Sequence, residues 1–192
     1  MDKGRIAGSV VVLALGVTLG TSVAWLPAAM GYRPWLVAGS SMRETLHDGD
    51  VVYAKPGAAP SREDIVIAES PAGWETGDDV LIKRVVASPG DEVTLDSSGR
   101  LHRGGSVDSP LVDSREKQWD SGCDATANGR SKTIRLGGDE WLLRGDNVNN
   151  SSDSRWAWCR GEDPAVGTAQ IDAVVKRVIP LGRALDVLTP SD

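Results

Sequence analysis

The sequence predicts a mainly β protein in which an N-terminal transmembrane helix is followed by an all-β domain. Three observations support this fold class: one long apolar stretch near the start, short β-branched runs after residue 50, and turn residues that separate these runs. No stretch after residue 50 keeps a helical period of 3.6 residues. Because the chain has 192 residues, it has room for about one domain beyond the apolar stretch.

The apolar stretch runs from Ile6 to Leu26 without a charged side chain. A helix of this length rises about 1.5 Å per residue and spans roughly 30 Å, the thickness of a bilayer core. A cleaved signal peptide is the alternative, but its apolar core is normally only about 7–15 residues long. We therefore expect a retained, single-pass anchor in contact with membrane lipid, with residues 1–5 in the cytoplasm and residues 27–38 as a juxtamembrane segment.

The basic residues that flank the anchor do not decide its orientation. Lys3 and Arg5 precede it, and Arg33 and Arg43 follow it, so the two sides carry equal positive charge.

The β domain is expected to cover residues 39–182, with a tail at 183–192. Residues 106–130 are polar and poor in β-branched side chains, which is typical of a long loop. A hairpin turn is expected at Ser97 to Gly99. The predicted strands are residues 51–54, 64–67, 79–86, 92–95, 101–103, 133–136, 140–144 and 171–179.

Composition excludes several classes of function. The net charge of −6 argues against a nucleic-acid partner, because phosphate binding requires a basic surface. Two histidines and the absence of CxxC and HExxH patterns argue against a metal site. We expect no metal and no cofactor.

The stretch from Gly39 to Leu46 opens the polar part of the chain and contains two adjacent serines, Ser40 and Ser41. A serine pair after glycine is usually a turn or a helix N-cap. A serine in such a place becomes a nucleophile only if the rest of the chain supplies a base.

Two side chains are candidates for that base. His102 lies in a predicted hairpin strand, where an exposed histidine is the simpler interpretation. Lys83 lies among large apolar residues in the predicted strand 79–86. If Lys83 faces inward, desolvation disfavours its ammonium form and lowers its pKa, which is how a lysine becomes a general base.

A third stretch, from Arg144 to Arg155, is dense in Asp, Asn and Ser directly after an apolar strand. It is longer and more polar than a turn requires. We expect its hydroxyl and amide groups to orient an ammonium group or to hold a neighbouring loop.

These stretches, in this order, resemble the type I signal peptidases, a family of membrane-anchored serine endopeptidases with a Ser-Lys dyad. The resemblance covers residues 6 to about 179 and rests on four stretches: Ser41 to Leu46 with Gly49 to Val52, Asp64 to Val66, Ile82 to Asp91, and Gly145 to Arg155. It implies that Ser41 is the nucleophile, Lys83 the general base, and Ser151 the hydroxyl that orients the lysine. The residues that it implies as structural neighbours of the site are Met42, Arg84, Asp146, Asn147, Asp153 and Arg155.

The sequence also departs from the family's pattern. Gly39 stands where a serine or threonine often helps the oxyanion hole, so we expect Ser40 to substitute and the backbone N–H of Ser41 to carry most of this role. Glu44 replaces a common proline, and Asn149 replaces a common acid. Residues 156–162 look like an insertion that carries Cys159.

The implied function is the removal of signal peptides from secreted pre-proteins, at the cell membrane, by a catalytic domain on the extracytoplasmic side. In that oxidising compartment Cys123 and Cys159 are expected to form a disulfide. Two alternatives remain: a catalytically degenerate anchored β domain that binds signal peptides, and a self-cleaving repressor-type Ser-Lys peptidase. The second requires a DNA-binding segment, where this chain has the apolar stretch.

Overall fold

A computed structural model describes residues 11–12, 30–72, 74, 79–96, 101–104, 132–148 and 150–182. Strands dominate these residues, so the mainly β class is confirmed. The elements are β1 (Val11–Val12), β2 (Arg33–Leu36), β3 (Val51–Pro56), β4 (Ile65–Glu69), β5 (Val80–Ala87), β6 (Glu92–Leu95), β7 (Leu101–Arg103), β8 (Lys132–Arg135), β9 (Glu140–Arg144), α2 (Ser154–Cys159), β10 (Val166–Gly167), the 3-10 helix η2 (Thr168–Gln170) and β11 (Ile171–Ile179).

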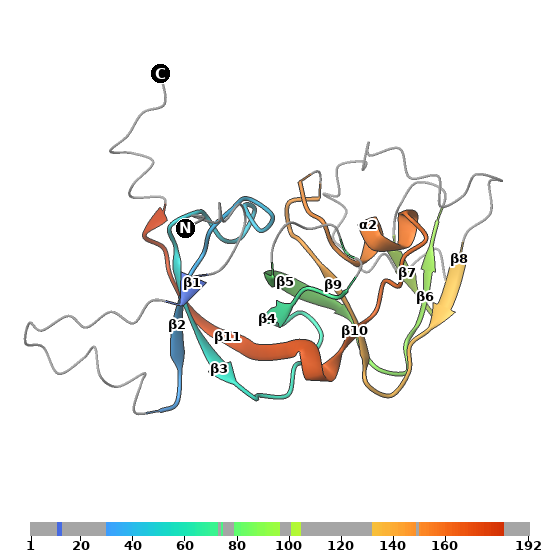
Figure 1. Ribbon diagram of the computed structural model, residues 1–192, viewed down its shortest axis with the longest axis horizontal. Helices are drawn as coiled ribbons and strands as arrows, with labels where there is room; N and C mark the ends of the chain where they lie inside the picture. Colours follow the sequence, from blue (N-terminus) through green and yellow to red (C-terminus); the bar gives the residue numbers. More distant parts are fainter. Residues whose placement is uncertain are drawn as a thin grey trace, which may run out of the picture.

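The strands form two antiparallel sheets. The large sheet has the order β1-β2-β3-β11-β4-β5-β9-β10, and the small sheet has the order β7-β6-β8. Figure 1 shows β2, β3 and β11 at one end of the molecule, the small sheet at the other, and β4, β5 and β9 between them. The central strands therefore have folded chain on both sides.

Burial patterns explain this placement. Strand β3 alternates between buried and partly buried residues, as expected for a strand with one covered face. Strand β5 is buried at nearly every position, so both of its faces are covered. Ile82 of β5 packs in one apolar cluster with Met42 and Leu46, whereas Leu81 and Val85 pack in another. Lys83 alternates with Leu81 and Val85 on the same face of β5. It therefore occupies a position that sequence alone would assign to a core residue.

The predicted strands are all present, with ends that move by a residue or two. Strand β2, helix α2, strand β10 and the 3-10 helix η2 were not predicted, and one expectation about a side chain was wrong. Strand β2 lies inside the expected juxtamembrane segment, where Pro34 is compatible with a position near a sheet edge. Helix α2 occupies part of the expected insertion; with six residues it is too short to give a helical period. His102 is 5% exposed, so the expectation of an exposed histidine was wrong.

The predicted anchor is largely outside the described residues. In the part of the chain that the structure describes, no helix is long and apolar enough to cross a membrane. Of the stretch from Ile6 to Leu26, only Val11 and Val12 are described, and they form a short strand paired with Leu36 and Trp35 where a helix was expected. Two adjacent β-branched residues favour a strand locally. The other expectations outside the described residues concern the loop at 106–130 with Cys123, the turn at Ser97 to Gly99, Asn149 and the tail.

Candidate active site

The predicted nucleophile lies in the connection between β2 and β3. The base of this connection is closed by two backbone hydrogen bonds, from Val37 N to Asp50 O (2.8 Å) and from Gly49 N to Val37 O (2.9 Å). Further along, Met42 and Leu46 are fully buried in the core and joined by a hydrogen bond from Leu46 N to Met42 O (2.7 Å). These apolar residues fix the loop to the sheet and leave Ser41 beside strand β5.

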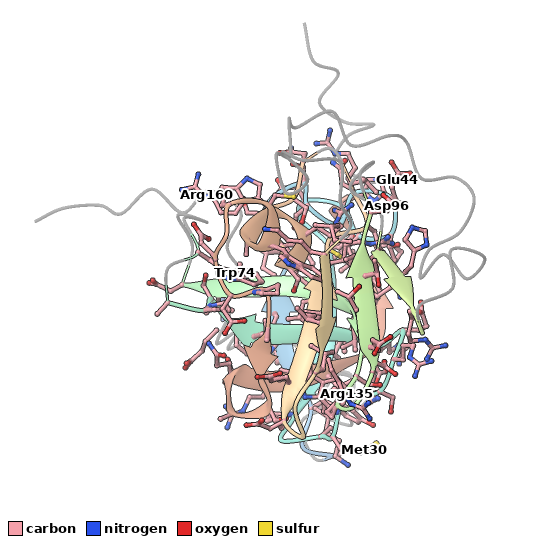
Figure 2. All side chains as sticks on the ribbon, turned by 90° about the vertical axis from the view of Figure 1, so that its right-hand side faces the viewer. Met30, Glu44, Trp74, Asp96, Arg135 and Arg160 are labelled. Carbon is pink, nitrogen blue, oxygen red and sulfur yellow. The ribbon has the colours of Figure 1, made fainter. Side chains whose placement is uncertain are left out.

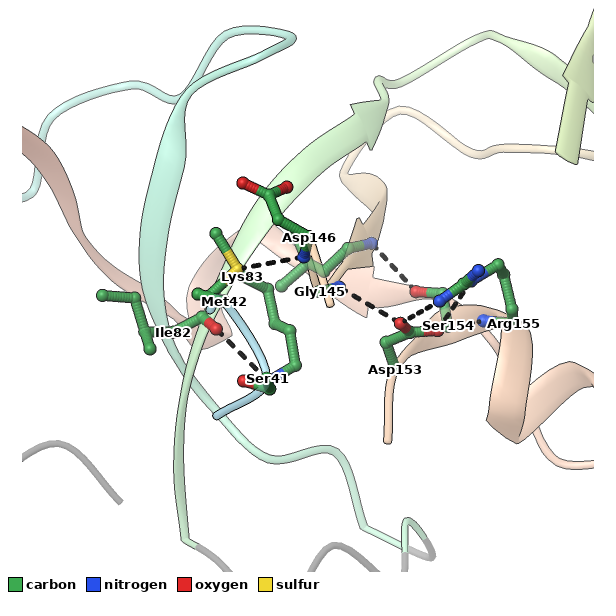
Figure 3. A network of polar contacts seen from close by, with 10 residues as sticks. Ser41, Met42, Ile82, Lys83, Gly145, Asp146, Asp153, Ser154 and Arg155 are labelled. Carbon is green, nitrogen blue, oxygen red and sulfur yellow. Dashed lines mark hydrogen bonds and ion pairs between the residues drawn. The ribbon is translucent and has the colours of Figure 1, made fainter. Parts of the chain in front are cut away.

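Lys83 reaches this serine from β5. The residue is 4% exposed and its side chain points inward, and its Nζ donates to Ser41 Oγ at 2.8 Å and to the carbonyl oxygen of Ile82 at 3.2 Å (Figure 3). Burial of this kind disfavours an ammonium relative to a neutral amine. The structure thus brings together the two residues that the sequence proposed as nucleophile and base.

The polar segment after β9 holds the nucleophile loop from the other side. Asn147 donates its backbone N–H to Ser41 O at 2.9 Å and its side-chain amide to Ser40 O at 2.9 Å. The amide of Asn150 donates to Ser40 Oγ at 2.7 Å. The N–H of Asp146 points to the sulfur of Met42 at 3.4 Å, as Figure 3 shows. Four contacts therefore fix three consecutive residues of the loop.

These contacts set the direction of the Ser41 N–H. The carbonyl of Ser40 and the N–H of Ser41 belong to one planar trans peptide and point in opposite directions. Because Asn147 and the N–H of Arg43 both donate to Ser40 O, the Ser41 N–H points away from them. Within the described residues, no backbone carbonyl accepts from that N–H. This geometry suits a donor for an oxyanion.

Ser151 lies against Gly145, close to the nucleophile. A Cβ built on Gly145 would lie 2.2 Å from Ser151 Oγ and 2.5 Å from the carbonyl oxygen of Ser41, so only glycine fits. The buried Ser151 hydroxyl has no partner with full hydrogen-bond geometry, and the expected bond to Lys83 is not formed here. It is near enough to Asp153 to lower the pKa of that carboxyl, although the contact falls short of a hydrogen bond.

Arg84, next to Lys83 on β5, is held by Asp146. Its Nε and Nη2 donate to the two carboxylate oxygens at 2.8 and 2.6 Å, and Thr45 donates to the same carboxylate. Burial raises the pKa of Asp146, but the hydrogen bonds from Arg84 and Thr45 and the charges of Arg84 and Arg144 outweigh this and hold it below its ordinary value. This ion pair connects β5, the nucleophile loop and the end of β9.

Asp153 and Arg155 form a second ion pair, which is fully buried. Asp153 caps helix α2 by accepting from the N–H of Arg155 (3.0 Å) and also accepts from its Nη2 (2.8 Å) and from Gly145 N (3.1 Å). Burial raises the pKa of Asp153, and the charge and hydrogen bonds of Arg155 lower it by more, so the net shift is downward. Ser154 accepts from the N–H of Leu143 at 2.9 Å, which ties α2 to β9 (Figure 3).

Other predicted residues lie away from this centre. Glu44, the departure from proline, is exposed at the surface, at the end of the molecule opposite Met30 (Figure 2). Cys159 packs against the core at the end of α2, and the described residues contain no free cysteine. Its expected partner Cys123 lies outside them. Asn150 lies in the stretch whose amides were expected to hold a neighbouring loop. The contact of Thr45 with Asp146 was not predicted, because a single polar residue in a turn carries no signal of what it will contact.

Comparison with known proteins assigns this arrangement to a family. The family described as signal peptidase, peptidase S26, matches residues 8–181. The chain belongs to this family. It is 29% identical over 144 residues to signal peptidase I T of Bacillus subtilis (strain 168), covering 72% of each chain. It is 28% identical over 153 residues to signal peptidase I S of the same organism, covering 77% of this chain and 79% of that relative.

A further relative is signal peptidase I of Bacillus licheniformis, 27% identical over 146 residues, covering 72% of this chain and 74% of the relative. The family match and these relatives agree with the resemblance recognised in the sequence. The chain is therefore a peptidase of the signal peptidase family.

Proposed function

We propose that this peptidase removes signal peptides from secreted pre-proteins with Ser41 as nucleophile and Lys83 as general base. One observation carries the assignment of the dyad: Lys83, a residue that is only 4% exposed, has its Nζ 2.8 Å from Ser41 Oγ. A base must be within hydrogen-bond reach of the proton that it takes, and it must be neutral before it can take it. Both conditions favour a buried lysine over an exposed one.

The reaction is an acyl transfer in two stages. Neutral Lys83 takes the hydroxyl proton of Ser41, whose Oγ attacks the scissile carbonyl carbon, and the resulting oxyanion is bound by the Ser41 N–H. The tetrahedral intermediate collapses with release of the amine, which receives the proton from Lys83. Water, deprotonated by Lys83, then attacks the ester, and the acid product leaves Ser41 free.

The place of the reaction follows from the predicted anchor. A transmembrane helix at residues 6–26 would hold the β domain at the surface of the cell membrane, where the cleavage site of a pre-protein emerges. We place the domain on the extracytoplasmic side. Protease added to intact cells or spheroplasts should digest the chain beyond about residue 35, and protection of this region would reverse the topology.

The decisive experiment is cleavage of a purified pre-protein by the full-length chain, with Ser41→Ala as the comparison. We expect one cut after the small residues that end the signal peptide, and no cut by the variant. Cleavage by a folded Ser41→Ala protein would refute the nucleophile. Binding of the signal peptide without cleavage by the wild-type chain would favour the degenerate, non-enzymatic alternative.

A further inference from the structure

The approach to the nucleophile contains one contact that the catalytic dyad does not explain. Gly39, two residues before Ser41, donates its backbone N–H to Oδ1 of Asp48 at 2.8 Å. We infer that Asp48 is a positioning residue of the reaction, which orients the Gly39 peptide and through it the oxyanion-binding N–H of Ser41. This inference rests on the proposed function.

The conformation of Gly39 makes such a contact consequential. Its φ is +108°, a backbone conformation that residues other than glycine rarely adopt. Glycine is also the residue with the greatest freedom in the unfolded chain, so its conformation must be imposed by a contact. The carboxylate of Asp48 supplies that contact, because the N–H that it accepts lies at the point where the chain leaves the β2 extension and turns toward Ser41.

Asp48 itself stands on a rigid turn. The turn is closed by hydrogen bonds from Asp50 N to His47 O (3.0 Å) and from His47 N to the buried carboxylate of Asp50 (2.8 Å). The segment that follows β11 packs on it, since Gly182 donates to Asp50 Oδ1 at 2.8 Å and a Cβ on Gly182 would lie only 2.1 Å from Asp48 O. The acceptor for Gly39 is thus fixed by its own turn and by the segment that follows β11.

The two sides of the nucleophile loop then have matching roles. Asn147 fixes the Ser40–Ser41 peptide from the side of β9, and Asp48 fixes the Ala38–Gly39 peptide from the side of β3. Loss of either contact allows the short segment between them to rotate, which moves the Ser41 N–H away from the place where negative charge develops. A donor that is misplaced in this way binds the oxyanion less well, although the substrate still binds.

The test compares Asp48→Ala and Asp48→Asn in the full-length protein, with a synthetic peptide that spans a signal-peptide cleavage site as substrate. Asp48→Ala removes the acceptor, and we expect kcat to fall about tenfold or more with little change in KM. Asp48→Asn keeps an oxygen that accepts the Gly39 N–H, and we expect most of kcat to return. Because Asp48 is exposed, neither change should alter the melting temperature greatly.

Glu140 is the matched control, since its carboxylate also accepts a glycine N–H, from Gly137 at 2.6 Å, in a turn away from the site. Glu140→Ala should leave kcat unchanged. The inference is overturned if Asp48→Ala keeps the wild-type kcat, if Asp48→Asn is as slow as Asp48→Ala, or if Glu140→Ala slows cleavage equally. Ser41→Ala, assayed in parallel, distinguishes failure of the proposed function from failure of the role of Asp48. Full activity of Ser41→Ala would refute the proposed function. An inactive Ser41→Ala beside an unimpaired Asp48→Ala would refute only the role of Asp48.

Discussion

Two polar pairs are built into the β framework, and they differ in how the chain brings their members together. Ser41 and Lys83 are 42 residues apart in sequence and meet where the nucleophile loop lies against β5. Asp96 and His102 are only 6 residues apart, at the end of the β6–β7 hairpin where the chain passes from β6 to β7 in the small sheet. One pair depends on the tertiary fold, and the other on a single hairpin.

This difference shows why residue type alone did not identify the base. Histidine is the commoner catalytic base, and His102 was a candidate on that ground. In the structure it is buried and paired with Asp96 in the small sheet, whereas Lys83 contacts the nucleophile. The general base is the residue whose side chain the fold places against the serine, regardless of its ordinary pKa.

The largest expected effect concerns the dyad itself. Ser41→Ala, Lys83→Ala and Lys83→Arg should each lower kcat by at least about a thousandfold, because each removes part of one catalytic unit and arginine remains protonated. The double variant Ser41→Ala/Lys83→Ala should be little worse than either single variant. Cleavage should also rise with pH on the acidic limb, as Lys83 loses its proton. Steady-state and single-turnover cleavage of the peptide substrate measure these effects.

His102→Gln is the comparison variant for this experiment, and it should retain cleavage at close to the wild-type rate. Ser40→Ala tests the neighbouring serine and should slow the reaction without abolishing it. Full activity of a folded Lys83→Arg protein, or loss of activity in His102→Gln with normal folding, would reverse the roles assigned to the two pairs. Circular dichroism establishes folding in each case.

The strands were predictable because their signal is local. The run from Glu140 to Arg144 and the run from Ile171 to Ile179 combine β-branched or large apolar residues with turn residues at both ends, and both are strands with those bounds. Helix α2 was not predictable, because six residues are too few to give a helical period and the helix is held by its packing on β9, which is a tertiary contact.

The site was predictable only in part, for the same physical reason. A lysine in an apolar strand normally faces outward, and nothing in the local sequence states that Lys83 faces inward or that Ser41 lies in front of it. The resemblance to a family supplied that pairing. The stretch from Arg144 to Arg155 was expected to hold a neighbouring loop, and Asn150 does so, whereas the contact of Asp48 had no signal of either kind, since exposed acids in turns are common.

The next largest effect is expected at the buried ion pair behind the site. Asp153→Ala leaves the guanidinium of Arg155 buried without its carboxylate and removes the cap of α2, so it should cost about 3–5 kcal/mol of unfolding free energy. Chemical denaturation followed by circular dichroism measures this loss. Asp146→Ala, at a pair that is less buried, should cost less.

The ion pairs of Asp153 and Asp146 also determine how the free energy of unfolding falls at acid pH. The folded-state pKa values of Asp153 and Asp146 are lowered, so both carboxylates contribute stability that is present above their ordinary pKa and is lost as pH falls through the folded-state values. The free energy of unfolding should therefore decline below about pH 4. Asp153→Asn should flatten this decline, and an unchanged pH dependence in that variant would contradict the assignment.

A slightly smaller effect is expected from the predicted disulfide between Cys123 and Cys159. A bridge between these two cysteines closes a long loop, and in the chain-entropy model it adds about 3–4 kcal/mol to the free energy of unfolding. Reduction should lower the melting temperature, and Cys159→Ser should reproduce that loss without abolishing cleavage. Mass spectrometry of the non-reduced protein gives the direct answer, and two alkylatable thiols in the native protein would rule the bridge out.

The smallest effect is expected at the pair in the small sheet. The side chains of His102 and Asp96, taken alone, are 7% and 26% exposed, and their contact lies within one hairpin that covers the core cluster around Leu95 and Leu101. Asp96→Asn and His102→Gln should each cost about 1 kcal/mol of unfolding free energy, because each keeps a polar group that can form one hydrogen bond. A double-variant cycle measures the coupling between them, which should be nonzero in stability and absent in kcat.

The dyad should show the opposite pattern, with coupling in kcat and little in stability, because its two members are held by separate elements of the core. A coupling in kcat at His102 and Asp96 would mean that the small sheet contributes to the reaction, and the distinction between a pair that the fold assembles for chemistry and a pair that stabilises one hairpin would fail.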